Sequence, residues 1–192
     1  YVIEEGYKRN FNFLPADFDN AKVESENNNA WGAFLGRYGN EGENGDKSPT
    51  TSVEIALGGK AQTIEFDFLR IDSWDNEKFN VWAGKEKILS ENFLTNTTKT
   101  TKTGTTTVSD GSKYTYTIEP YGSKANAVFS GWVDQKYRVS ITTPPGMETL
   151  DLGFSSTLNQ SISDESWGID NLSYTKPPVG GGDSIYSRRF NS

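Results

Sequence analysis

The chain has 192 residues and a net charge of -7, and it contains neither histidine nor cysteine. Its length fits one all-β domain that is large enough to bury a hydrophobic core. The acidity, with a sequence pI near 4.7, argues against a nucleic-acid partner and favours cations. Disulfides, histidine-ligated zinc and the Ser-His-Asp and Cys-His triads are excluded, so any catalysis would depend on carboxylates, tyrosine, lysine or a metal.

No apolar run approaches the roughly 20 residues of a membrane-spanning helix, so we expect no membrane insertion. The chain begins at Tyr1 rather than Met, which fits a processed piece of a longer protein, so the lack of a signal peptide says little about location. Three N-x-S/T triplets, at Asn96, Asn159 and Asn171, give slight support to exposure outside the cell.

Short segments of alternating polarity, separated by turn residues, predict about ten strands and no sustained helix. The expected strand segments are residues 11–13, 31–38, 53–57, 63–74, 78–88 (a hairpin), 114–118, 127–132, 137–141, 150–154 and 164–174. Gly36 indicates a bulge or a close backbone approach, and Gly58 with Gly59 indicates a tight hairpin turn. Residues 133–136 are expected to form a turn between two strands.

Residues 96–111 are rich in Thr and Lys and hold one apolar side chain, Val108. This composition is typical of a mobile or edge hairpin that lysines protect from aggregation. The alternatives are a loop that contacts a ligand and a site for O-linked glycans.

The strand pattern predicts an all-β, two-sheet antiparallel sandwich of the jelly-roll, lectin-like kind over residues 1–176. Two prolines and three glycines then mark a linker, and the tail ends with aromatic and arginine residues, so that residues 177–192 form a separate linker and tail. The tail is expected to be disordered or to dock on a neighbouring molecule.

Two acidic turns flank tryptophans, one at residues 72–77 around Trp74 and the other at the start of 164–174 around Trp167. If the strand that ends at Trp74 pairs antiparallel with the strand that starts near Trp167, the two turns meet at one end of a sheet. Clustered carboxylates repel one another unless they are protonated or bridged by a cation, and Ca²⁺ is the hard cation that such oxygen ligands suit. We expect at least one of the two tryptophans to be buried.

Six side chains are the candidate ligands of this Ca²⁺ site. They are Asp72, Asp75, Glu77, Asp170 and Asn171, with Asp19 joining them or forming a second site. The alternative is that these residues only form turns, in which Asp72 and Asp75 bond to backbone amides. Backbone carbonyls and water would complete the six to eight oxygen ligands of the cation.

Three short motifs carry a resemblance to known modules: LGRYG at 35–39, IDSWDNE at 71–77 and ESWGIDN at 165–171. On these motifs, residues 10–175 resemble extracellular jelly-roll modules, in particular the ligand-binding and peptide-binding domains of RTX-type adhesins. They are more loosely similar to MAM- and laminin-G-like sandwiches. The resemblance implies a β-sandwich with Ca²⁺ in acidic loops and a role in adhesion rather than catalysis. It also makes Asp170 the foremost single metal ligand.

An enzymatic alternative comes from residues 65–70, which resemble the E-x-D-x-x-E strand of sandwich-fold glucanases. Glu65 and Asp67 share a face, but Arg70 stands at the third acidic position, so the acid/base partner of a retaining pair is missing. We therefore expect a binding protein and not an enzyme.

The sequence favours an extracellular or cell-surface, calcium-dependent adhesion module that recognises a glycan or a peptide on a cell surface. The alternative is a structural module of a surface array or filament, in which the tail contacts neighbouring modules of the same protein. Aromatic residues and arginine are enriched at the centres of such interfaces.

Overall fold

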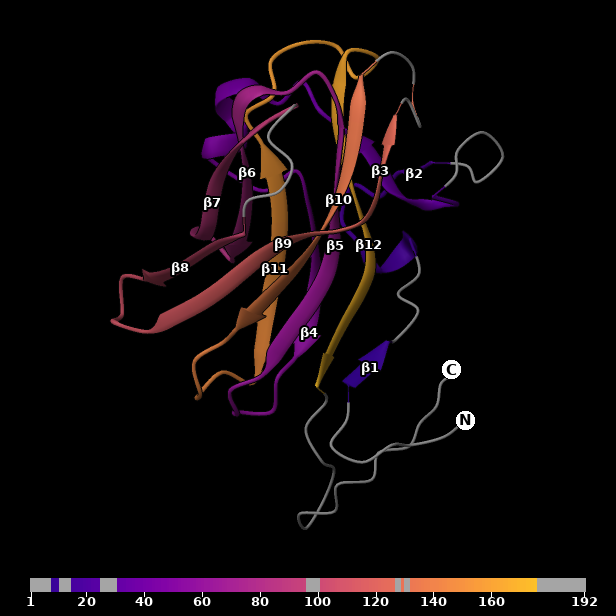
Figure 1. Cartoon of the computed structure of the whole chain (residues 1–192). Coiled ribbons are helices and arrows are strands. Elements are labelled where there is room, and N and C mark those ends of the chain that lie inside the picture. The colour runs from indigo at the N-terminus through magenta and orange to yellow at the C-terminus, as the bar shows by residue number, and fades with distance from the viewer. Residues whose placement is uncertain are drawn as a thin grey trace.

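A computed structural model of the chain describes residues 8–10, 15–24, 31–95, 101–126, 129 and 132–175. Within them, antiparallel strands form two sheets that face each other (Figure 1), which confirms the predicted all-β sandwich. The strands are β1 (Lys8–Asn10), β2 (Val23–Glu24), β3 (Phe34–Tyr38), β4 (Thr51–Ala56), β5 (Thr63–Asp72), β6 (Asp75–Ala83), β7 (Glu86–Leu94), β8 (Lys102–Thr107), β9 (Lys113–Asn126), β10 (Val133–Thr142), β11 (Thr149–Ser156) and β12 (Glu165–Thr175). Two short 3₁₀ helices are η1 (Pro15–Asp17) and η3 (Gly42–Asp46).

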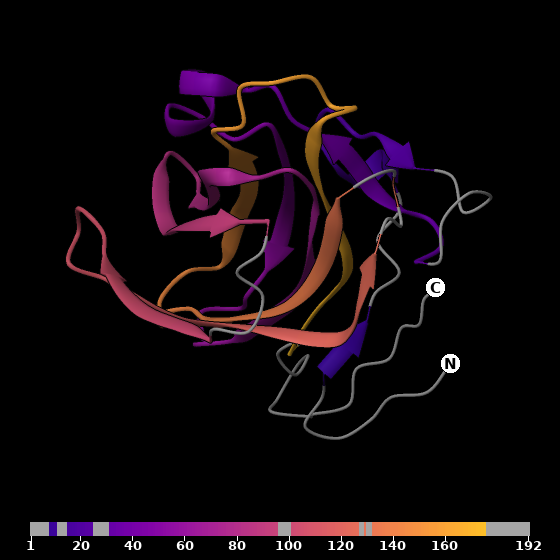
Figure 2. The ribbon, with the colours of Figure 1, turned by 45° about the horizontal axis from the view of Figure 1, so that its top comes forward.

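The large sheet has the strand order β2-β3-β12-β5-β10-β9-β8, and β1 also pairs with β12. The small sheet has the order β4-β11-β6-β7. Figure 2 shows the large sheet curving around the small one, with the hairpin of β8 and β9 projecting beyond it. The chain crosses between the sheets from β3 to β4, from β4 to β5, from β5 to β6, from β7 to β8, from β10 to β11 and from β11 to β12.

The sequence predicts that the turn at Gly58 and Gly59 joins two paired strands of a hairpin. This prediction is wrong, because β4 and β5 belong to different sheets. The turn instead pairs with the connection before β11, since the amides of Gly58 and Gly59 donate to the carbonyls of Glu148 and Met147. The two glycines adopt positive φ angles of 65° and 77°, so the tight turn itself is present. Sequence alone shows that the chain reverses here, but not which strand it joins.

The predicted turn at residues 133–136 is also wrong, because these residues begin strand β10. Gln135 pairs with Arg70 of β5, and Lys136 pairs with Tyr121 of β9, so the segment has neighbours on both sides. A register shift between Asp134 and Lys136 breaks the alternation that would have revealed the strand.

Phe68 lies at the centre of the core between the two sheets. Its ring stacks on Phe79 of the small sheet at a centroid distance of 4.0 Å and on Tyr137 of the large sheet at 5.6 Å. Trp74 and Trp167 have no exposed surface, which confirms the expected tryptophan burial. One continuous aromatic core therefore joins the two sheets.

Gly36 allows β3 and β12 to approach closely, as the sequence predicts. A Cβ atom there would lie 3.0 Å from the carbonyl oxygen of Trp167, and the register between the strands shifts between Trp167 and Gly168. On this outer side of the large sheet, Phe34, Leu69 and Ile71 form a second, smaller apolar cluster.

The Thr- and Lys-rich segment supplies the edge strand β8 from residue 102 onward, which confirms the edge-hairpin interpretation. The hydroxyl of Thr106 donates to the carbonyl of Ile88 in β7 at 2.8 Å and so links the two sheet edges. Residues 96–100, the N-terminal strand at 11–13 and the 177–192 tail lie outside the described residues, as does most of the strand expected at 127–132. Trp132 lies outside any strand, and half of its side chain is exposed.

In the part of the chain that the structure describes, no helix has the length and apolar character needed to cross a membrane.

Strand β12 runs from one end of the sandwich to the other. It begins at Glu165, beside the β5–β6 connection, and ends at Thr175, where β1 pairs with it (Figure 1). Its eleven residues span about 33 Å at the usual rise of a strand. We call the end that holds Glu165 the acidic end.

Candidate metal centre

The two acidic turns meet at the acidic end, as the sequence predicts. Asp72 pairs with Glu165 across β5 and β12. The amide of Ser73 donates to the carbonyl of Asp164 at 3.1 Å, and the hydroxyl of Ser73 donates to the carboxylate of Asp164 at 3.0 Å. Two segments that lie about 90 residues apart in the chain are therefore held side by side.

Three carboxylates form a cluster there, which we call the acidic cluster: Asp75 and Glu77 of β6 and Glu165 of β12. One oxygen from each lies within 4.8 Å of one from each of the others. Asp75 is exposed, Glu77 is half-buried and Glu165 is fully buried. Because β6 belongs to the small sheet and β12 to the large one, the cluster joins both sheets of the sandwich.

The short connection from β5 to β6 brings Asp75 and Glu77 together. Asp72 and Asn76 adopt positive φ angles of 65° and 78°, a conformation that Asp and Asn tolerate better than most residues. The register of β6 against β7 also shifts between Asp75 and Glu77. The amide of Asp75 donates to Oε1 of Glu77 at 2.6 Å, so the backbone of one acidic residue holds the side chain of the other.

Glu165 is the buried member of the acidic cluster, and only one of its oxygens is satisfied. Oε2 accepts hydrogen bonds from the amides of Asn159 and Gln160 at 3.3 and 3.2 Å. Oε1 is buried and has no hydrogen-bond partner. Burial and the nearby charges of Glu77 and Asp164 raise the pKa of Glu165 to about 7, although the two amides act to lower it. This oxygen is therefore available to bind a cation.

The donor set fits a hard cation with oxygen ligands. Three carboxylates offer three to six oxygens, whereas Ca²⁺ takes six to eight at 2.3–2.6 Å. The remaining ligands would be water or backbone carbonyls. The cluster contains no nitrogen or sulfur donor, which argues against the softer transition metals.

Asp72 does not join the acidic cluster. Its carboxylate is fully buried on the other side of the turn, 3.5 Å from Arg37, and neither of its oxygens accepts a hydrogen bond. Burial, followed by the charge of Asp134, raises its pKa well above the usual range, while Arg37 acts to lower it. Asp134 accepts a hydrogen bond from the amide of Asp72 at 2.8 Å.

Asp170 and Asn171 lie away from the acidic cluster. Asp170 pairs with Asp67 of β5, five residues along β12 from Glu165, which is about 17 Å at the rise of a strand. Nδ2 of Asn171 donates to Asp67 at 2.7 Å. Burial is the main cause that raises the pKa of Asp170. One ion cannot bind both Asp170 and Asp75, so the expected single ligand set is divided.

Asp19 lies at a third place, beside the edge strand β4. It forms an isolated bridge with Ser52, and its carbonyl accepts a hydrogen bond from Thr51 at 2.6 Å. Strand β11 separates β4 from β6, so Asp19 is remote from Asp75. Of the six expected ligands, the structure therefore brings together Asp75 and Glu77.

Sequence reasoning missed Glu165 as a candidate ligand, although it placed this residue in the second acidic turn. The expected pairing of β12 with β5 could have identified Glu165, because it places the beginning of β12 opposite the end of β5. The choice of Asp170 came instead from the resemblance and not from the expected pairing of the strands.

The face of β5 that suggested a glycosidase is occupied by a network of ionic and hydrogen bonds. Arg138 lies 3.0 Å from Asp67 and 3.5 Å from Glu65, so these acids do share a face. Asp67 also accepts from Tyr121 at 2.6 Å and from Asn171. The buried Asp67 is therefore fully engaged in contacts that join β5, β9, β10 and β12.

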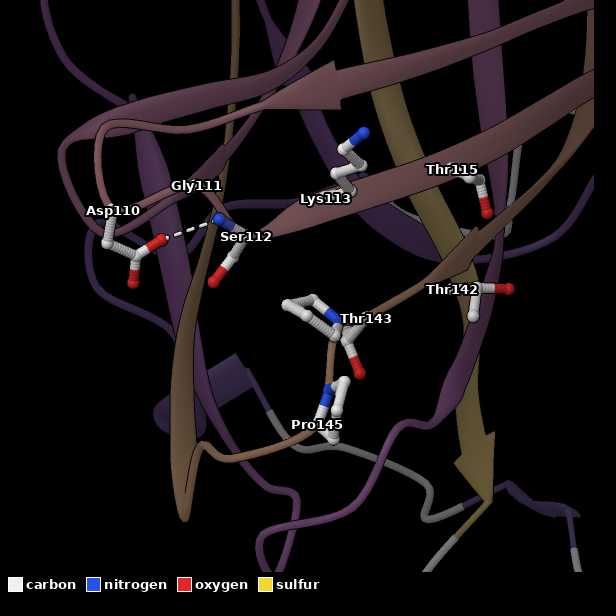
Figure 3. Close-up of a pocket in the computed structure, with 9 residues that line it drawn as sticks. Asp110, Gly111, Ser112, Lys113, Thr115, Thr142, Thr143 and Pro145 are labelled. Atoms are coloured by element: carbon white, nitrogen blue, oxygen red, sulfur yellow. Dashed lines mark hydrogen bonds between the residues drawn. The ribbon is translucent and has the colours of Figure 1, made fainter.

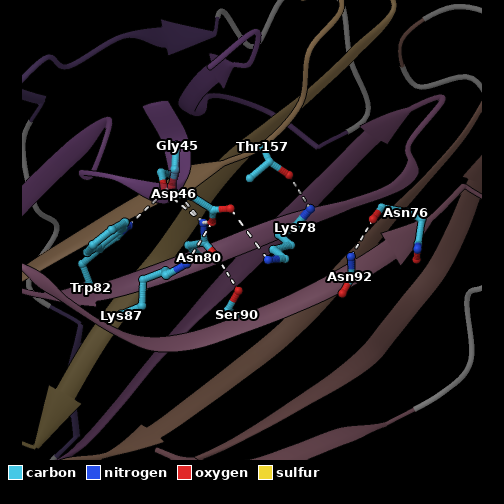
Figure 4. A network of polar contacts seen from close by, with 11 residues as sticks. Gly45, Asp46, Asn76, Lys78, Asn80, Trp82, Lys87, Ser90, Asn92 and Thr157 are labelled. Atoms are coloured by element: carbon cyan, nitrogen blue, oxygen red, sulfur yellow. Dashed lines mark hydrogen bonds and ion pairs between the residues drawn. The ribbon is translucent and has the colours of Figure 1, made fainter. Parts of the chain in front are cut away.

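A second polar network covers the outer face of the small sheet (Figure 4). The carboxylate of Asp46 in η3 lies 3.0 Å from Nζ of Lys87 and 3.7 Å from Nζ of Lys78, and it accepts a hydrogen bond from Nδ2 of Asn80 at 3.0 Å. Burial acts to raise the pKa of Asp46, but its hydrogen bonds and the lysine charges outweigh that effect and lower it. Each charge has a partner here, so the network anchors η3 on the sheet.

A shallow pocket of about 580 Å³ lies beside the β8–β9 turn (Figure 3). Its lining includes Asp110, Lys113 and the prolines that follow β10, and the amide of Ser112 donates to Asp110 at 2.8 Å. The pocket lies near Thr142, which pairs with Thr63 at the end of β5 that is remote from the acidic cluster. Its lining brings together no set of metal ligands or catalytic groups.

Comparisons of this chain with protein-family models, with curated proteins and with solved structures found no match. The proposals below therefore stand on the geometry of the molecule.

Proposed function

We propose that this protein is a calcium-binding β-sandwich module for recognition, and that Asp75, Glu77 and Glu165 hold the cation. The unpartnered Oε1 of Glu165, buried within a group of three carboxylates, is the observation that carries the proposal. A buried charged oxygen without a partner is costly, and a bound cation removes that cost.

The position of the acidic cluster gives the cation a structural role. It connects β6 of the small sheet with β12 of the large sheet, near the buried side chains of Trp74 and Trp167. An ion that binds only the folded chain must stabilise it. Calcium would therefore join the two sheets at the acidic end.

The same position leaves the cation accessible to a ligand. Asp75 is exposed, and three carboxylates do not fill the coordination shell of Ca²⁺. Oxygens of a peptide carboxylate or of vicinal sugar hydroxyls can replace bound water there. Sites with few protein ligands bind Ca²⁺ with dissociation constants of about 10⁻⁴ to 10⁻³ M, the range of extracellular modules. We propose that this ligand is a glycan or a peptide on a cell surface.

Titration calorimetry with Ca²⁺ on chelated and dialysed protein tests the cation site. We expect saturable binding to the wild type, and a dissociation constant raised at least 30-fold in Glu165→Gln. Glu54→Gln is the matched control, because Glu54 is an exposed carboxylate of β4 outside the acidic cluster. Equal affinity in the wild type and Glu165→Gln would refute the site, as would the absence of binding to the wild type.

Arrays of glycans and of peptides, probed with and without Ca²⁺, test the recognition step. A ligand that binds the wild type only in Ca²⁺, and that does not bind Glu165→Gln, is the expected result. Ligand binding that persists in chelator would show that recognition does not require the cation, and it would contradict this part of the proposal.

A further inference from the structure

A second cavity lies at the end of the sandwich that is remote from the acidic cluster. It has a volume of about 260 Å³ and lies between the β6–β7 turn, the β8–β9 turn and the connection from β10 to β11. Strand β6 runs from Asp75 of the acidic cluster to Ala83, which lines the cavity, and its nine residues span about 26 Å. Because pockets for drug-sized molecules begin at about 300 Å³, a cavity of this size suits a single side chain.

Part of the lining is apolar and includes one buried hydroxyl. Val108, Met147 and Leu150 line the cavity, and each belongs to the hydrophobic core or packs against it. Tyr114 also lines the cavity, and only 3% of its surface is exposed. Its hydroxyl donates to Sδ of Met147 at 3.4 Å, and sulfur is a weak acceptor. No described residue donates to the Tyr114 oxygen, so this buried oxygen is free to accept a hydrogen bond from a ligand.

Three carboxylic acids, Glu86, Asp110 and Asp151, also line the cavity. Burial, followed by the negative charges of Asp110 and Glu86, raises the pKa of Tyr114, which places both carboxylates close to its hydroxyl. Hydrogen bonds from Ser112 lower the pKa of Asp110, so this group is ionised at neutral pH. Among the described residues, none of the three acids forms an ion pair. The lining therefore carries negative charge that no cation of the described chain balances.

The placement of these carboxylates suits an organic cation better than a metal ion. In the part of the chain that the structure describes, only the acidic cluster brings three metal-ligating groups within 4.8 Å of one another. The amide and the hydroxyl of Ser109 donate to the two oxygens of Glu86 at 2.8 and 3.1 Å, and the amide of Ser112 donates to Asp110 at 2.8 Å. These contacts hold both carboxylates in place, so little ordering is needed when a ligand binds.

We propose that this cavity binds the lysine or arginine side chain of a peptide. The alkyl stem packs against the apolar lining, and the cationic head contacts the carboxylates of Glu86 and Asp110 and the oxygen of Tyr114. Asp110 and Ser112 (Figure 3) also line the pocket of about 580 Å³, so the two cavities adjoin, and the larger one has room for neighbouring residues of the peptide. This site is independent of the proposed cation site, because the two lie at opposite ends of the sandwich.

Met147 is the single methionine of the chain, so a ¹³C-methyl label on methionine gives one NMR signal, and that signal comes from the lining of the cavity. The labelled full chain is titrated in chelator with three capped pentapeptides, which carry lysine, arginine or norleucine between alanines. We expect the lysine and arginine peptides to shift the signal saturably, with dissociation constants on the order of 1 mM. The norleucine peptide lacks the cation and should bind about tenfold more weakly. Added salt should weaken binding of the charged peptides.

Two conservative variants test the groups that contact the cation. Asp110→Asn removes the charge but keeps an acceptor for the amide of Ser112, and Tyr114→Phe removes only the hydroxyl. Each should weaken binding of the lysine peptide about fivefold. Glu119→Gln is the matched control, because Glu119 is an exposed acid of β9 outside the cavity. Its affinity should stay within about twofold of the wild type, as should that of Glu165→Gln.

Three results would overturn the proposal. The first is the absence of a saturable shift with both charged peptides. The second is equal affinity for the lysine and norleucine peptides, which would show that the charge is not recognised. The third is an unchanged affinity in both Asp110→Asn and Tyr114→Phe. Because the titration is done in chelator, its failure leaves the cation site standing, and a failure of calcium binding leaves this site standing.

Discussion

Two glutamates of this protein, the half-buried Glu41 and the buried Glu165, differ in how their carboxylates are satisfied. Glu41 accepts hydrogen bonds from the hydroxyls of Thr50 and Ser156 and, at 3.0 Å, from the indole of Trp167. Glu165 has two amide donors on one oxygen and none on the other. The carboxylate of Glu41 is therefore satisfied by protein donors, whereas Oε1 of Glu165 has no partner. The number of hydrogen-bond donors on each oxygen therefore distinguishes a structural carboxylate from a candidate metal ligand better than the burial of the side chain does.

Replacing Glu41 with Gln should destabilise the fold. Burial raises the pKa of Glu41, while its three side-chain donors act to lower it. A glutamine would direct an NH₂ group at one or more of these donors, which costs about 1–3 kcal/mol. Urea denaturation measures the loss, with Glu43→Gln in the exposed part of η3 as the control. A loss equal to that of the control would contradict the contact.

Without metal, stability should fall as the pH rises from about 4 to 7. The pKa of Glu165 is raised to about 7 in the folded chain, and that of Asp72 is also raised, whereas both lie near 4 in an unfolded chain. The folded state holds more protons in that window, so this stabilisation is complete below about pH 4 and is lost as the pH passes through 7.

Denaturation in chelator at pH 5, 6, 7 and 8 measures this dependence. Glu165→Gln should flatten the profile and be more stable than the wild type at pH 8, because it removes a buried ionised group. A wild-type profile that rises over the same window would contradict the assignment of the pKa shifts. Saturating Ca²⁺ should also flatten the wild-type profile, since the cation favours ionised Glu165.

At the scale of elements, η3 is held against the small sheet by a close approach at Gly45. A Cβ atom at this position would lie 1.6 Å from the carbonyl oxygen of Ser156. The carbonyl of Gly45 accepts from the hydroxyl of Ser155 at 2.6 Å and from Nδ2 of the Asn80 side chain at 2.9 Å. Because glycine has no Cβ atom, the backbone of η3 can pack directly against the backbone of β11 at this position.

Gly45→Ala should therefore cost at least 2 kcal/mol of unfolding free energy, the scale of an overpacked core. Asn44→Ala is the neighbouring control, since Asn44 is exposed. Thermal and urea denaturation of both variants measure the difference. Equal stability would mean that η3 does not pack on β11 as described.

At the scale of the whole molecule, the acidic cluster and the last residues of β12 lie at opposite ends of the sandwich (Figure 1). The cluster joins both sheets, and the core that holds Phe68 also spans both. We therefore expect the described sandwich to unfold as one cooperative unit.

Calcium should raise the melting temperature of this unit. At 100 times the dissociation constant, a ligand of the folded state adds about 2.7 kcal/mol. For a chain of this length, that corresponds to a rise of roughly 5–10 °C. Calorimetric melts with Ca²⁺ and with chelator measure the shift, and Glu165→Gln should show less than 2 °C. A single transition is expected in both conditions, and two transitions would show that the sheets unfold separately.

Much of the fold could be predicted from local patterns. Alternating apolar residues identify strands such as β4 and β5 because a strand that faces a core on one side must bury every second side chain. The same pattern places Phe66 and Phe68 in the core, and it failed at residues 133–136, where a bulge interrupts the alternation.

The candidate site could be predicted only in part. The acidic composition, the lack of histidine and the β5–β6 turn were sufficient to name Asp75 and Glu77 as candidate ligands of a hard cation, and the structure brings these two carboxylates together. They were not sufficient to identify Glu165, because its distance from Glu77 depends on how β12 pairs with β5. They were also not sufficient to exclude Asp72, whose carboxylate points toward Arg37 instead.

The sequence by itself therefore determined the class of fold and many of the core residues, because periodicity is a local property, and its carboxylates suggested the oxygen-ligated cation that we propose. Only the tertiary structure decided which strands pair, which sheet each strand joins and which carboxylates meet. Those outcomes depend on strand register and on contacts between segments far apart in the chain. A displacement of five residues along β12 separates Glu165 from Asp170 by about 17 Å, and so determines which of them can share an ion with Asp75.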